Sequence, residues 1–355
     1  MRYTHKGKIA VAMSGGIDSS VSAMLLKEEG FEVIGVHLKL WRCPSGVAKR
    51  SCCGPMDMED ARRVAETLGI SFVTLDMTEV FKEKVILPFV KDYSRGRTPN
   101  PCILCNDYIK FGALIEWLES ELGVYRLATG HHARIQEENG RYLLLKGKDP
   151  SKDQSYFLFD IKKEILPKLL FPVGGYTKEE VRKIGSRLHV AEKRESEDIC
   201  FLLDGDPAAF IERFYPEYAR EGGAFLDENG KVLGRHRGIH AFTIGQRRGL
   251  GMGFGKRTYV KEIRESGEVV LADDASLYRD SCTIEKVNLL SDVGTEFDAD
   301  VKIRYRTAHV PARISLFEGD KARIDFSKKV RAITPGQAAV FYIGEEVVGG
   351  GWIVS

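Results

Sequence analysis

The chain has 355 residues, of which 43% are hydrophobic and 29% charged, and its formal net charge at pH 7 is +2. The length suits two or three domains, and the composition is that of an ordinary globular protein, which excludes a largely disordered chain. No run approaches the roughly 18 apolar residues of a membrane span, and a strand-like segment follows the N-terminus directly, so we expect neither a membrane partner nor a signal peptide.

The first half of the chain alternates predicted strands with predicted helices. Short apolar runs indicate strands at residues 9–13, 31–38, 70–75 and 125–129. Apolar residues at helical spacing, followed in each case by a glycine, indicate helices at residues 19–29, 57–68 and 109–122. Strands separated by helices are typical of the α/β class, so we predict a doubly wound parallel sheet covered on both faces.

The pattern changes after about residue 205. Residues 206–277 predict a small mixed domain rich in glycine, and the stretch 231–264 within it holds nine basic residues against one acid. A local charge of this kind attracts polyanions. Farther on, short alternating runs such as 301–305, 322–326 and 338–342 are separated by turn signals and indicate a C-terminal antiparallel β-barrel or a sandwich. We therefore expect three domains, with bounds at 1–205, 206–277 and 278–355.

The segment between the first predicted strand and the first predicted helix has the composition of a phosphate-binding loop. Residues 14–20 read Ser-Gly-Gly-Ile-Asp-Ser-Ser. Glycines allow a close approach of backbone to an anion, a helix N-terminus offers amide N–H groups, and Ser14, Ser19 and Ser20 add hydroxyl donors. The segment has neither the Gly-Lys-Ser/Thr ending of a Walker loop nor a dinucleotide-binding Gly-x-Gly-x-x-Gly. The alternative interpretation is an ordinary strand-to-helix turn with a serine cap.

The seven cysteines make a poor disulfide framework, because their number is odd and Cys52 and Cys53 are adjacent. A cytoplasmic protein with reactive or metal-binding thiols fits them better. Cys102 and Cys105 stand three residues apart on a polar, proline-rich turn. This spacing suits a redox pair, half of a metal site, or a nucleophile with a helper, whereas two buried structural cysteines are the simpler alternative.

The other cysteines give weaker signals. Cys200 taken alone is interpreted as a buried cysteine, and Cys282 is expected in a core. Cys43 lies near the adjacent pair in the sequence, but these three residues provide only three close ligands for zinc, so we interpret them as structural.

Several motifs, in the same order along the chain, resemble those of the tRNA-specific 2-thiouridylases of the PP-loop ATP pyrophosphatase superfamily. The resemblance covers nearly the whole chain. It rests on the loop at 14–19, Thr-Pro-Asn-Pro at 98–101, Cys-Asn at 105–106, Thr-Gly-His at 129–131, Lys-Asp-Gln-Ser-Tyr-Phe at 152–157, Phe-Pro-Val-Gly at 171–174, Ile-Cys-Phe at 199–201, Thr-Ile-Gly-Gln-Arg-Arg-Gly-Leu-Gly at 243–251 and Thr-Pro-Gly-Gln at 334–337.

The resemblance implies ATP-dependent conversion of the wobble-position uridine of tRNA to 2-thiouridine. ATP adenylates O2 of the base and releases pyrophosphate, and sulfur then replaces AMP at C2. Asp18 is expected to arrange Mg²⁺. The resemblance and the loop together place the nucleotide against Ala12, Met13, Ser14, Gly15, Gly16, Ile17, Asp18, Ser19, Leu38 and Gly130.

The same resemblance makes Cys105 the nucleophile and Cys200 the carrier of a persulfide sulfur. This chain departs from the family by having Cys102 where other members have Asp. Together the three thiols could instead hold a 4Fe-4S cluster with one iron open to sulfide. Persulfide chemistry implies a cysteine desulfurase or a sulfur-relay protein as partner, whereas free sulfide could suffice for a cluster, and both routes stay open.

The resemblance also implies contacts with tRNA along the chain. These are Asn100, Pro101, Cys102, His131, Lys152, Asp153, Gln154, Arg304, Tyr305 and Gln337. The charge of the 231–264 stretch adds Arg247 and Arg248, since clustered cations bind phosphates by counterion release. The target uridine must leave its stack to expose O2, so a base pocket beside the nucleotide is required.

Three other functions share part of these features. Another PP-loop ATP pyrophosphatase, such as a synthetase that amidates a small metabolite, would share the loop but would not need the thiols or the basic stretch. A thiolase acting on another tRNA position would share all of the chemistry. A non-catalytic RNA-binding or iron-sulfur sensing protein would not need an intact loop beside Cys105 and Cys200.

Overall fold

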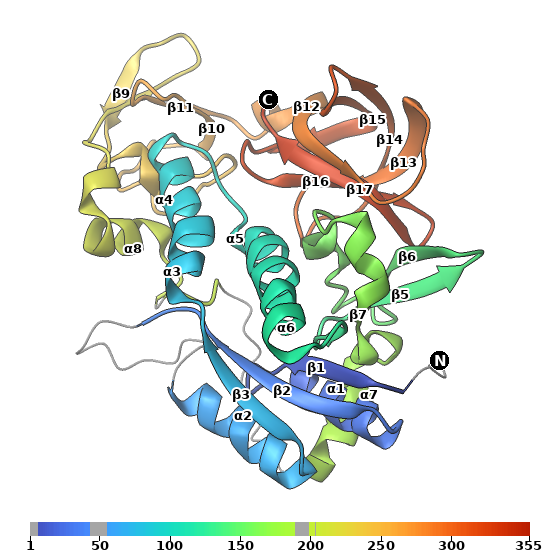
Figure 1. Cartoon of the computed structure of the whole chain (residues 1–355). Helices are drawn as coiled ribbons and strands as arrows, with labels where there is room; N and C mark the ends of the chain where they lie inside the picture. The colour runs from blue at the N-terminus through green and yellow to red at the C-terminus, as the bar shows by residue number, and fades with distance from the viewer. Residues whose placement is uncertain (1–5, 43–54, 189–198, 203) are drawn as a thin grey trace. The chain divides into compact units, whose positions relative to one another are not determined.

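The computed structural model describes residues 6–42, 55–188, 199–202 and 204–355 (Figure 1). The chain divides into two compact units. The first comprises Met1–Val85, Cys102–Leu203 and Glu345–Val347, and the second comprises Ile86–Pro101, Asp204–Gly344 and Val348–Ser355. The three cysteines interpreted as structural, Cys43, Cys52 and Cys53, lie outside the described residues.

The first unit is built on a five-stranded parallel sheet with the strand order β3-β2-β1-β4-β7. Its strands are β1 (Lys8–Ala12), β2 (Glu32–Lys39), β3 (Ser71–Asp76), β4 (Leu127–Ala128) and β7 (Leu169–Leu170). β1 lies between β2 and β4, so the order reverses at β1. In open α/β sheets, ligands bind at the carboxyl ends of the strands where the order reverses.

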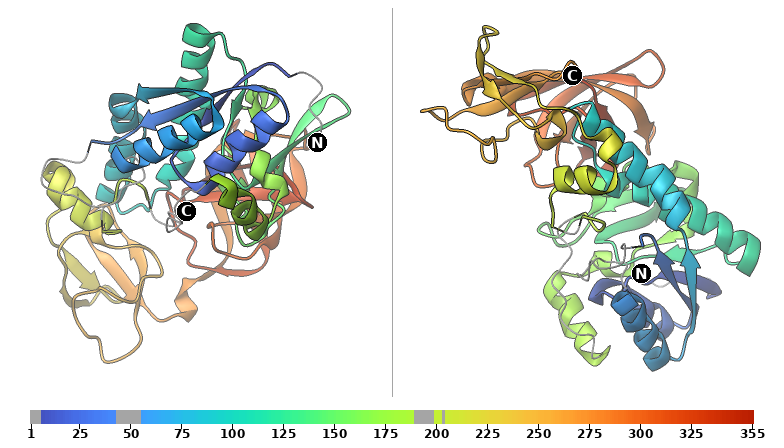
Figure 2. Two further views of the ribbon diagram at one scale, coloured as in Figure 1. Left: turned by 90° about the horizontal axis from the view of Figure 1, so that it is seen from below. Right: turned by 90° about the vertical axis from the view of Figure 1, so that its left-hand side faces the viewer.

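Helices cover both faces of this sheet. α1 (Ile17–Glu28) and α2 (Pro55–Leu68) contact each other and the strands, and they lie side by side in front of the sheet in the left view of Figure 2. α6 (Leu114–Leu122) lies on the opposite side of the sheet (Figure 1). α7 (Lys178–Gly185) packs against α1. The predicted doubly wound α/β fold is therefore confirmed.

Shorter elements complete the first unit. A hairpin of β5 (Ala133–Glu138) and β6 (Arg141–Lys146) pairs through Leu145 with Glu346, the first residue of β17. The remaining helical elements are α3 (Thr78–Phe81), the π-helix η1 (Lys82–Ile86), which runs into the second unit, α5 (Pro101–Leu104), the π-helix η2 (Cys105–Ala113), and the 3₁₀ turns η3 (Ser155–Leu158), η4 (Lys163–Lys168), η5 (Pro172–Gly175) and η6 (Ser186–Leu188).

The second unit contains a small four-stranded sheet in the order β10-β11-β8-β9. Phe225 and Leu271 are buried in its core. The strands are β8 (Ala224–Leu226), β9 (Val232–Arg235), β10 (Tyr259–Ile263) and β11 (Val269–Ala272). Beside it lie α4 (Leu87–Ser94), α8 (Pro207–Phe214) and the 3₁₀ turns η7 (Pro216–Tyr218), η8 (Ile239–Ala241) and η9 (Ala275–Leu277). The rings of Phe89 on α4 and Phe210 on α8 pack edge to face at 6.4 Å.

The second unit also contains a closed antiparallel barrel, in which β12 pairs with both β15 and β17. Its strands are β12 (Tyr278–Leu289), β13 (Glu296–Lys302), β14 (Val310–Phe317), β15 (Lys321–Arg331), β16 (Ala338–Ile343) and β17 (Glu346–Ile353). Alternate residues of β13 and β15 are buried, as the sequence pattern predicted. The barrel is thus confirmed over a sandwich.

Two predicted strands differ from those observed. The run 301–305 leaves the barrel after Lys302, because Thr307 closes a turn onto the carbonyl of Arg304 with both its backbone N–H and its hydroxyl. The predicted strand at 125–129 forms ladder pairs only over β4. In the described part of the chain, no helix is long and apolar enough to cross a membrane.

Candidate active site

The predicted phosphate loop lies at the point where the sheet order reverses. β1 ends at Ala12, the loop follows, and α1 begins at Ile17 with Gly16 as its N-cap. No side chain among the described residues caps this helix end, so its first amide N–H groups can bind an anion. Leu38 lies near the carboxyl end of the neighbouring strand β2 and is buried. The structure therefore brings the predicted nucleotide residues to one edge of the sheet.

Two glycines allow the backbone to pack tightly around this loop. Gly15 has a φ of +74°, and a Cβ there would lie 2.3 Å from the carbonyl oxygen of Asp57. Gly130 follows β4, and a Cβ there would lie 2.6 Å from the backbone nitrogen of Ser19. Any larger residue would collide with backbone at either position, so both glycines are needed for the observed geometry.

The serine hydroxyls of the loop are used inside the loop. The hydroxyls of Ser19 and Ser20 donate to the carbonyl of Gly16 at 3.0 and 2.9 Å, and Ser19 Oγ accepts from the backbone N–H of Ser14 at 3.2 Å. These side chains hold the loop in shape. The anion donors in this conformation are therefore backbone N–H groups.

Asp18, on the first turn of α1, is paired from two sides. Lys178 Nζ donates to both carboxylate oxygens of Asp18 at 2.8 Å, and His132 Nε2 lies 3.2 Å from Asp18 Oδ1. Burial by itself raises the pKa of Asp18, but the hydrogen bond from His132 and the charge of Lys178 outweigh burial and hold the pKa below its usual value. Asp18 is therefore a stable carboxylate at neutral pH.

Cys105 begins the π-helix η2 and is buried. π-helical segments are rare and are frequent at functional sites. Burial raises the pKa of the Cys105 thiol, and the charge of Lys110 opposes this shift only in part. Lys110 donates to Asn106 Oδ1 at 3.0 Å, and Asn106 Nδ2 donates to the carbonyl of Phe157 at the same distance. In this conformation Cys105 is thus a neutral thiol on a well-fixed helical turn.

The segment of Cys200 packs near this helix. The ring of Phe201 meets that of Phe81 edge to face at 5.9 Å, and α3, which carries Phe81, packs against η2. Cys200 and Cys102 are both half-buried. Among the described residues, no three His, Cys, Asp or Glu side chains are gathered so that they could hold a metal ion. The structure therefore does not assemble the predicted three-thiol cluster site.

His131 lies beside the same helix and is neutral. Burial, together with the charge of Lys110, lowers its pKa well below 6.5. Its Nδ1 is 2.7 Å from Thr129 Oγ1, and its ring packs edge to face on Phe171 at 5.7 Å. If His131 contacts tRNA as predicted, it does so as a neutral ring, by stacking or by a neutral hydrogen bond.

The turn that precedes the thiols is fixed within the second unit. The backbone N–H of Thr98 donates to the carbonyl of Pro335 at 2.9 Å, and Gln337 Nε2 donates to the carbonyls of Thr98 and Pro99 at 3.0 and 3.4 Å. Asn100 is buried. Gln337, predicted as a tRNA contact, therefore holds the Thr-Pro-Asn-Pro turn in this structure.

The predicted contact loop 152–154 has two inward-facing members. Asp153 is buried and accepts from the backbone N–H groups of Gly147 and Ser155 at 2.9 and 3.1 Å. Gln154 Oε1 accepts from the backbone N–H of His132 at 3.0 Å, and Lys152 is half-buried. Gln154 thereby fixes the loop that leads from Gly130 into β5, and Asp153 ties the contact loop to Gly147.

Arg304 is likewise turned inward, whereas Arg247 and Arg248 face solvent. Arg304 donates to the carbonyls of Ile244 and Ala332 at 3.2 and 2.8 Å and to the hydroxyl of Thr334, and the neighbouring Tyr305 is half-buried. Both arginines of this pair are exposed. Its loop is fixed by Gln246, whose side chain accepts from the N–H of Thr243 and donates to the carbonyl of Arg248.

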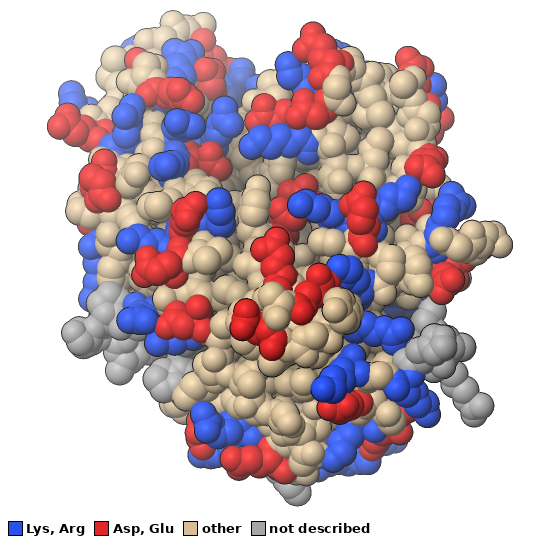
Figure 3. Space-filling model, viewed as in Figure 1, with Lys and Arg blue, Asp and Glu red and all other residues tan. Residues whose placement is uncertain are grey.

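The cation excess of the 231–264 stretch is partly neutralised by acids. Lys261 pairs with Glu228, which lies outside the stretch, and Arg264 pairs with Glu262. Arg237 approaches two more acids, Asp206 and Glu212, within 4 Å. On the face drawn in Figure 3, basic and acidic side chains are interspersed. Exposed pairs of this kind are weak, so polyanion binding can still compete for these cations.

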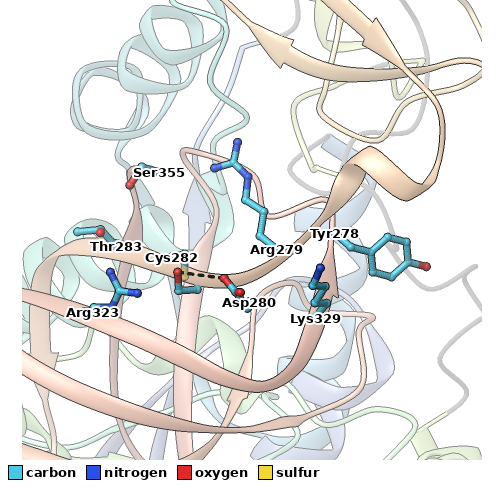
Figure 4. Close-up of a pocket in the computed structure, with 9 residues that line it drawn as sticks. Tyr278, Arg279, Asp280, Cys282, Thr283, Arg323, Lys329 and Ser355 are labelled. Atoms are coloured by element: carbon cyan, nitrogen blue, oxygen red, sulfur yellow. Dashed lines mark hydrogen bonds between the residues drawn. The ribbon is translucent and has the colours of Figure 1, made fainter. Parts of the chain in front are cut away.

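A separate cavity of about 370 Å³ lies in the barrel, around the buried Cys282 (Figure 4). It is lined by Tyr278, Arg279, Asp280, Ser281, Cys282, Thr283, Arg323, Lys329 and Ser355. Burial raises the pKa of Cys282 to about 12, which makes it an inert core thiol as expected. None of the predicted site residues lines this cavity.

Family comparisons match the chain in three consecutive parts. A model described as the tRNA methyl transferase HUP domain matches residues 7–204, the tRNA methyl transferase PRC-barrel domain matches 208–273, and the aminomethyltransferase beta-barrel domain matches 279–353. The tRNA-specific 2-thiouridylase MnmA of Carboxydothermus hydrogenoformans is 44% identical, over 98% of this chain and 97% of its own length. The chain belongs to the tRNA-specific 2-thiouridylase family.

The comparisons include a second curated relative and a solved structure. The tRNA-specific 2-thiouridylase MnmA 1 of Caldanaerobacter subterraneus subsp. tengcongensis is 45% identical, over 98% of this chain and 97% of its own length. Among solved structures, the U34-tRNA thiolase NcsA from Methanococcus maripaludis with its [4Fe-4S] cluster is 18% identical, with a TM-score of 0.33, over 59% of this chain and 67% of that one.

Sequence reasoning on this thiouridylase missed two residues of the site, Lys178 and His132. Lys178 is the first residue of α7 and directly follows Thr177, which forms a capping box with Glu180. A lysine at the positive end of a helix dipole is unfavourable, and this was the available signal that it has an acidic partner. His132 stands next to the predicted His131 and carried no separate signal.

Proposed function

We propose that this protein uses ATP to convert the wobble-position uridine of tRNA to 2-thiouridine. The observation that carries the proposal is that one compact unit holds both halves of the chemistry. The phosphate loop with Asp18 lies at the switch point of the sheet, and Cys105 and Cys200 belong to the same unit. The full-length likeness to tRNA-specific 2-thiouridylases supports the substrate.

The loop binds and orients the phosphates of ATP. Its backbone N–H groups and the N-terminus of α1 face the reversal point of the sheet, where they stabilise negative charge. Asp18 is a carboxylate of the kind that holds Mg²⁺ together with substrate phosphates, and Mg²⁺ when bound supplies charge neutralisation. The uridine O2 attacks the α-phosphorus and pyrophosphate leaves, which converts O2 into part of a good leaving group, AMP.

The two thiols then deliver sulfur. In the persulfide route, the outer sulfur on Cys200 attacks C2 of the adenylated base and AMP leaves with O2. The Cys105 thiolate attacks the inner sulfur of Cys200, so that the sulfur bound to C2 is released as the thiocarbonyl and a Cys105–Cys200 disulfide forms. A dithiol reductant restores both thiols, and a cysteine desulfurase or sulfur-relay protein reloads Cys200.

Cys105 needs a change of surroundings before it can act. Its burial keeps it protonated in this conformation. Lys110, one helical turn farther along η2, is the cation whose charge favours the thiolate. We infer that binding of tRNA opens this position to the base, after which Lys110 lowers the pKa of the thiol.

The alternative route uses a 4Fe-4S cluster on Cys102, Cys105 and Cys200. The described residues do not gather three such ligands in this conformation, so we derive no step through a cluster. Cys102 provides the third thiol that a cluster would need, so the persulfide and cluster routes are compared directly in the experiment below. The persulfide route requires only Cys105 and Cys200.

The deciding experiment is anaerobic thiolation of unmodified tRNA. Protein purified without iron, and protein after iron–sulfur reconstitution, each receive ATP, Mg²⁺ and either sulfide or a persulfide donor, and digested nucleosides are analysed by mass spectrometry. We expect 2-thiouridine with the persulfide donor from metal-free protein. Product only after reconstitution would support the cluster. Product mapped to a position other than the wobble uridine would assign a different thiolase, and no product would point to another ATP pyrophosphatase.

A further inference from the structure

Lys178 is a buried cation that local structure does not explain. Its side chain is 6% exposed, and it occupies the first turn of α7, where the helix dipole disfavours positive charge. Burying a charge is costly unless a partner compensates it. The compensating group is Asp18, 160 residues earlier, both of whose oxygens lie 2.8 Å from Lys178 Nζ.

His132 approaches the same carboxylate from the loop between β4 and β5. Its side chain is 3% exposed, and its Nε2 lies 3.2 Å from Asp18 Oδ1. Its other ring nitrogen, Nδ1, is buried and has no hydrogen-bond partner among the described residues. Buried polar atoms are nearly always hydrogen-bonded, so this nitrogen indicates that a further group, such as a water molecule, belongs at the site.

We propose that Lys178 holds the face of Asp18 to which Mg²⁺ binds with ATP, and that its ammonium moves from Asp18 to the nucleotide phosphates when ATP binds. This inference rests on the proposed function, which supplies ATP as the ligand. Lysine and Mg²⁺ prefer the same carboxylate oxygens, so they compete for Asp18. A lysine released inside a buried site must meet another anion. Asp18 stands in the first turn of α1, two residues after the N-cap Gly16, so the nearest new anion for the flexible side chain of Lys178 is a phosphate bound at this helix end.

This movement of the Lys178 ammonium gives Lys178 one role before ATP binds and another during the reaction. Before ATP binds, Lys178 keeps the Asp18 carboxylate oriented toward the loop. After the exchange it stands beside the pyrophosphate group, on which negative charge grows as the bond to the α-phosphorus breaks. Lys178 would then be a catalytic residue, because it touches the leaving group.

The test measures binding of ATP by calorimetry over a series of Mg²⁺ concentrations. Lys178→Gln removes the charge but keeps a donor to Asp18. We expect its affinity for ATP at saturating Mg²⁺ to fall about tenfold or more, as for loss of a charged hydrogen bond. The Mg²⁺ concentration that gives half-maximal ATP binding should fall several-fold, because the metal no longer competes with an ammonium. The expected result is therefore weaker binding of ATP together with tighter apparent binding of Mg²⁺.

The matched control is Lys148→Met. Lys148 is an exposed lysine outside α7, and it pairs with Glu180, which lies on the same turn of α7 as Lys178. Its loss should change neither the ATP affinity nor the Mg²⁺ midpoint. Two results for a folded Lys178→Gln protein would overturn the proposal: an unchanged ATP affinity, or a lower ATP affinity together with a higher Mg²⁺ midpoint. Lys178 would then only stabilise the fold.

If Lys178→Gln does not fold, as judged by circular dichroism, Lys178→Arg replaces it. Arg keeps the charge, so we expect a folded protein with a Mg²⁺ midpoint close to that of the wild type, and complete loss of ATP binding would contradict the exchange. Failure of the proposed function is a separate result. It would appear as wild-type protein that binds ATP but forms no 2-thiouridine, while Lys178→Gln still shows both shifts relative to the wild type.

Discussion

Gln337 donates its side-chain N–H to the main-chain carbonyl of Thr98, 239 residues earlier in the chain, at 3.0 Å. A second, longer bond reaches the carbonyl of Pro99, and Thr98 Oγ1 donates to Thr243 Oγ1 at 3.1 Å. The turn that leads into α5, with Cys102, is thereby fixed by Thr243 and by Gln337, which the family resemblance predicted as a tRNA contact. Gln337 can affect the reaction through this turn without touching the substrate.

We predict that Gln337→Ala lowers the free energy of unfolding by about 1 kcal/mol, the value of one partly buried hydrogen bond. It should also lower the rate of thiolation, because the turn that leads into α5 loses its hydrogen bonds from the Gln337 side chain. Chemical denaturation and a thiolation assay check this, with Gln136→Ala on the hairpin strand β5 as control. Weaker tRNA binding at unchanged stability would instead make Gln337 a direct tRNA contact.

We predict that Cys105→Ala and Cys200→Ala each abolish 2-thiouridine formation, because each thiol makes or breaks a bond to sulfur. Binding of tRNA, measured by filter retention, should stay within about threefold of the wild type. Cys282→Ala is the control, since that thiol is buried in the barrel and inert. Substantial product from either of the first two variants would remove that cysteine from the mechanism.

We predict that tRNA binding by Arg247→Ala/Arg248→Ala is weaker and less dependent on salt. Both arginines are exposed on a fixed loop, so each can neutralise one phosphate. The slope of log K against log salt should become shallower by about 1.5 to 2. Arg313→Ala is the matched control, because that exposed arginine lies outside the 231–264 stretch and pairs with both Glu296 and Asp298. An unchanged slope in the double variant would show that the pair does not contact RNA.

We predict that alkylation of Cys105 by iodoacetamide is slow at pH 7 and accelerates as the pH rises. Burial raises the pKa of this thiol, so the reactive thiolate forms only above the usual range for cysteine. Peptide mass spectrometry follows each cysteine separately. Added tRNA should increase the rate at pH 7 if binding exposes the thiol, and rapid labelling of Cys105 at pH 7 without tRNA would contradict its burial.

Much of the site was predictable from local sequence. The Ser-Gly-Gly-Ile-Asp-Ser-Ser segment joins a strand to a helix, as expected, although the helix already begins inside it at Ile17. This was predictable because glycine tolerance and helix initiation are properties of neighbouring residues. The alternation of apolar runs likewise gave the parallel sheet and the barrel strands. Where a strand end depended on a turn closed by Thr307, the local pattern extended the strand too far.

Local sequence was enough to predict the composition of the loop, the spacing of the thiols and many of the helices and strands, since these follow from short-range conformational preference. Three relations needed the folded protein: the contact of Lys178 with Asp18, the support that Gln337 gives to the turn at Thr98, and the burial that keeps Cys105 a neutral thiol. These relations join residues more than a hundred positions apart or depend on burial. Both are set by how the elements pack, which no local pattern in the chain encodes.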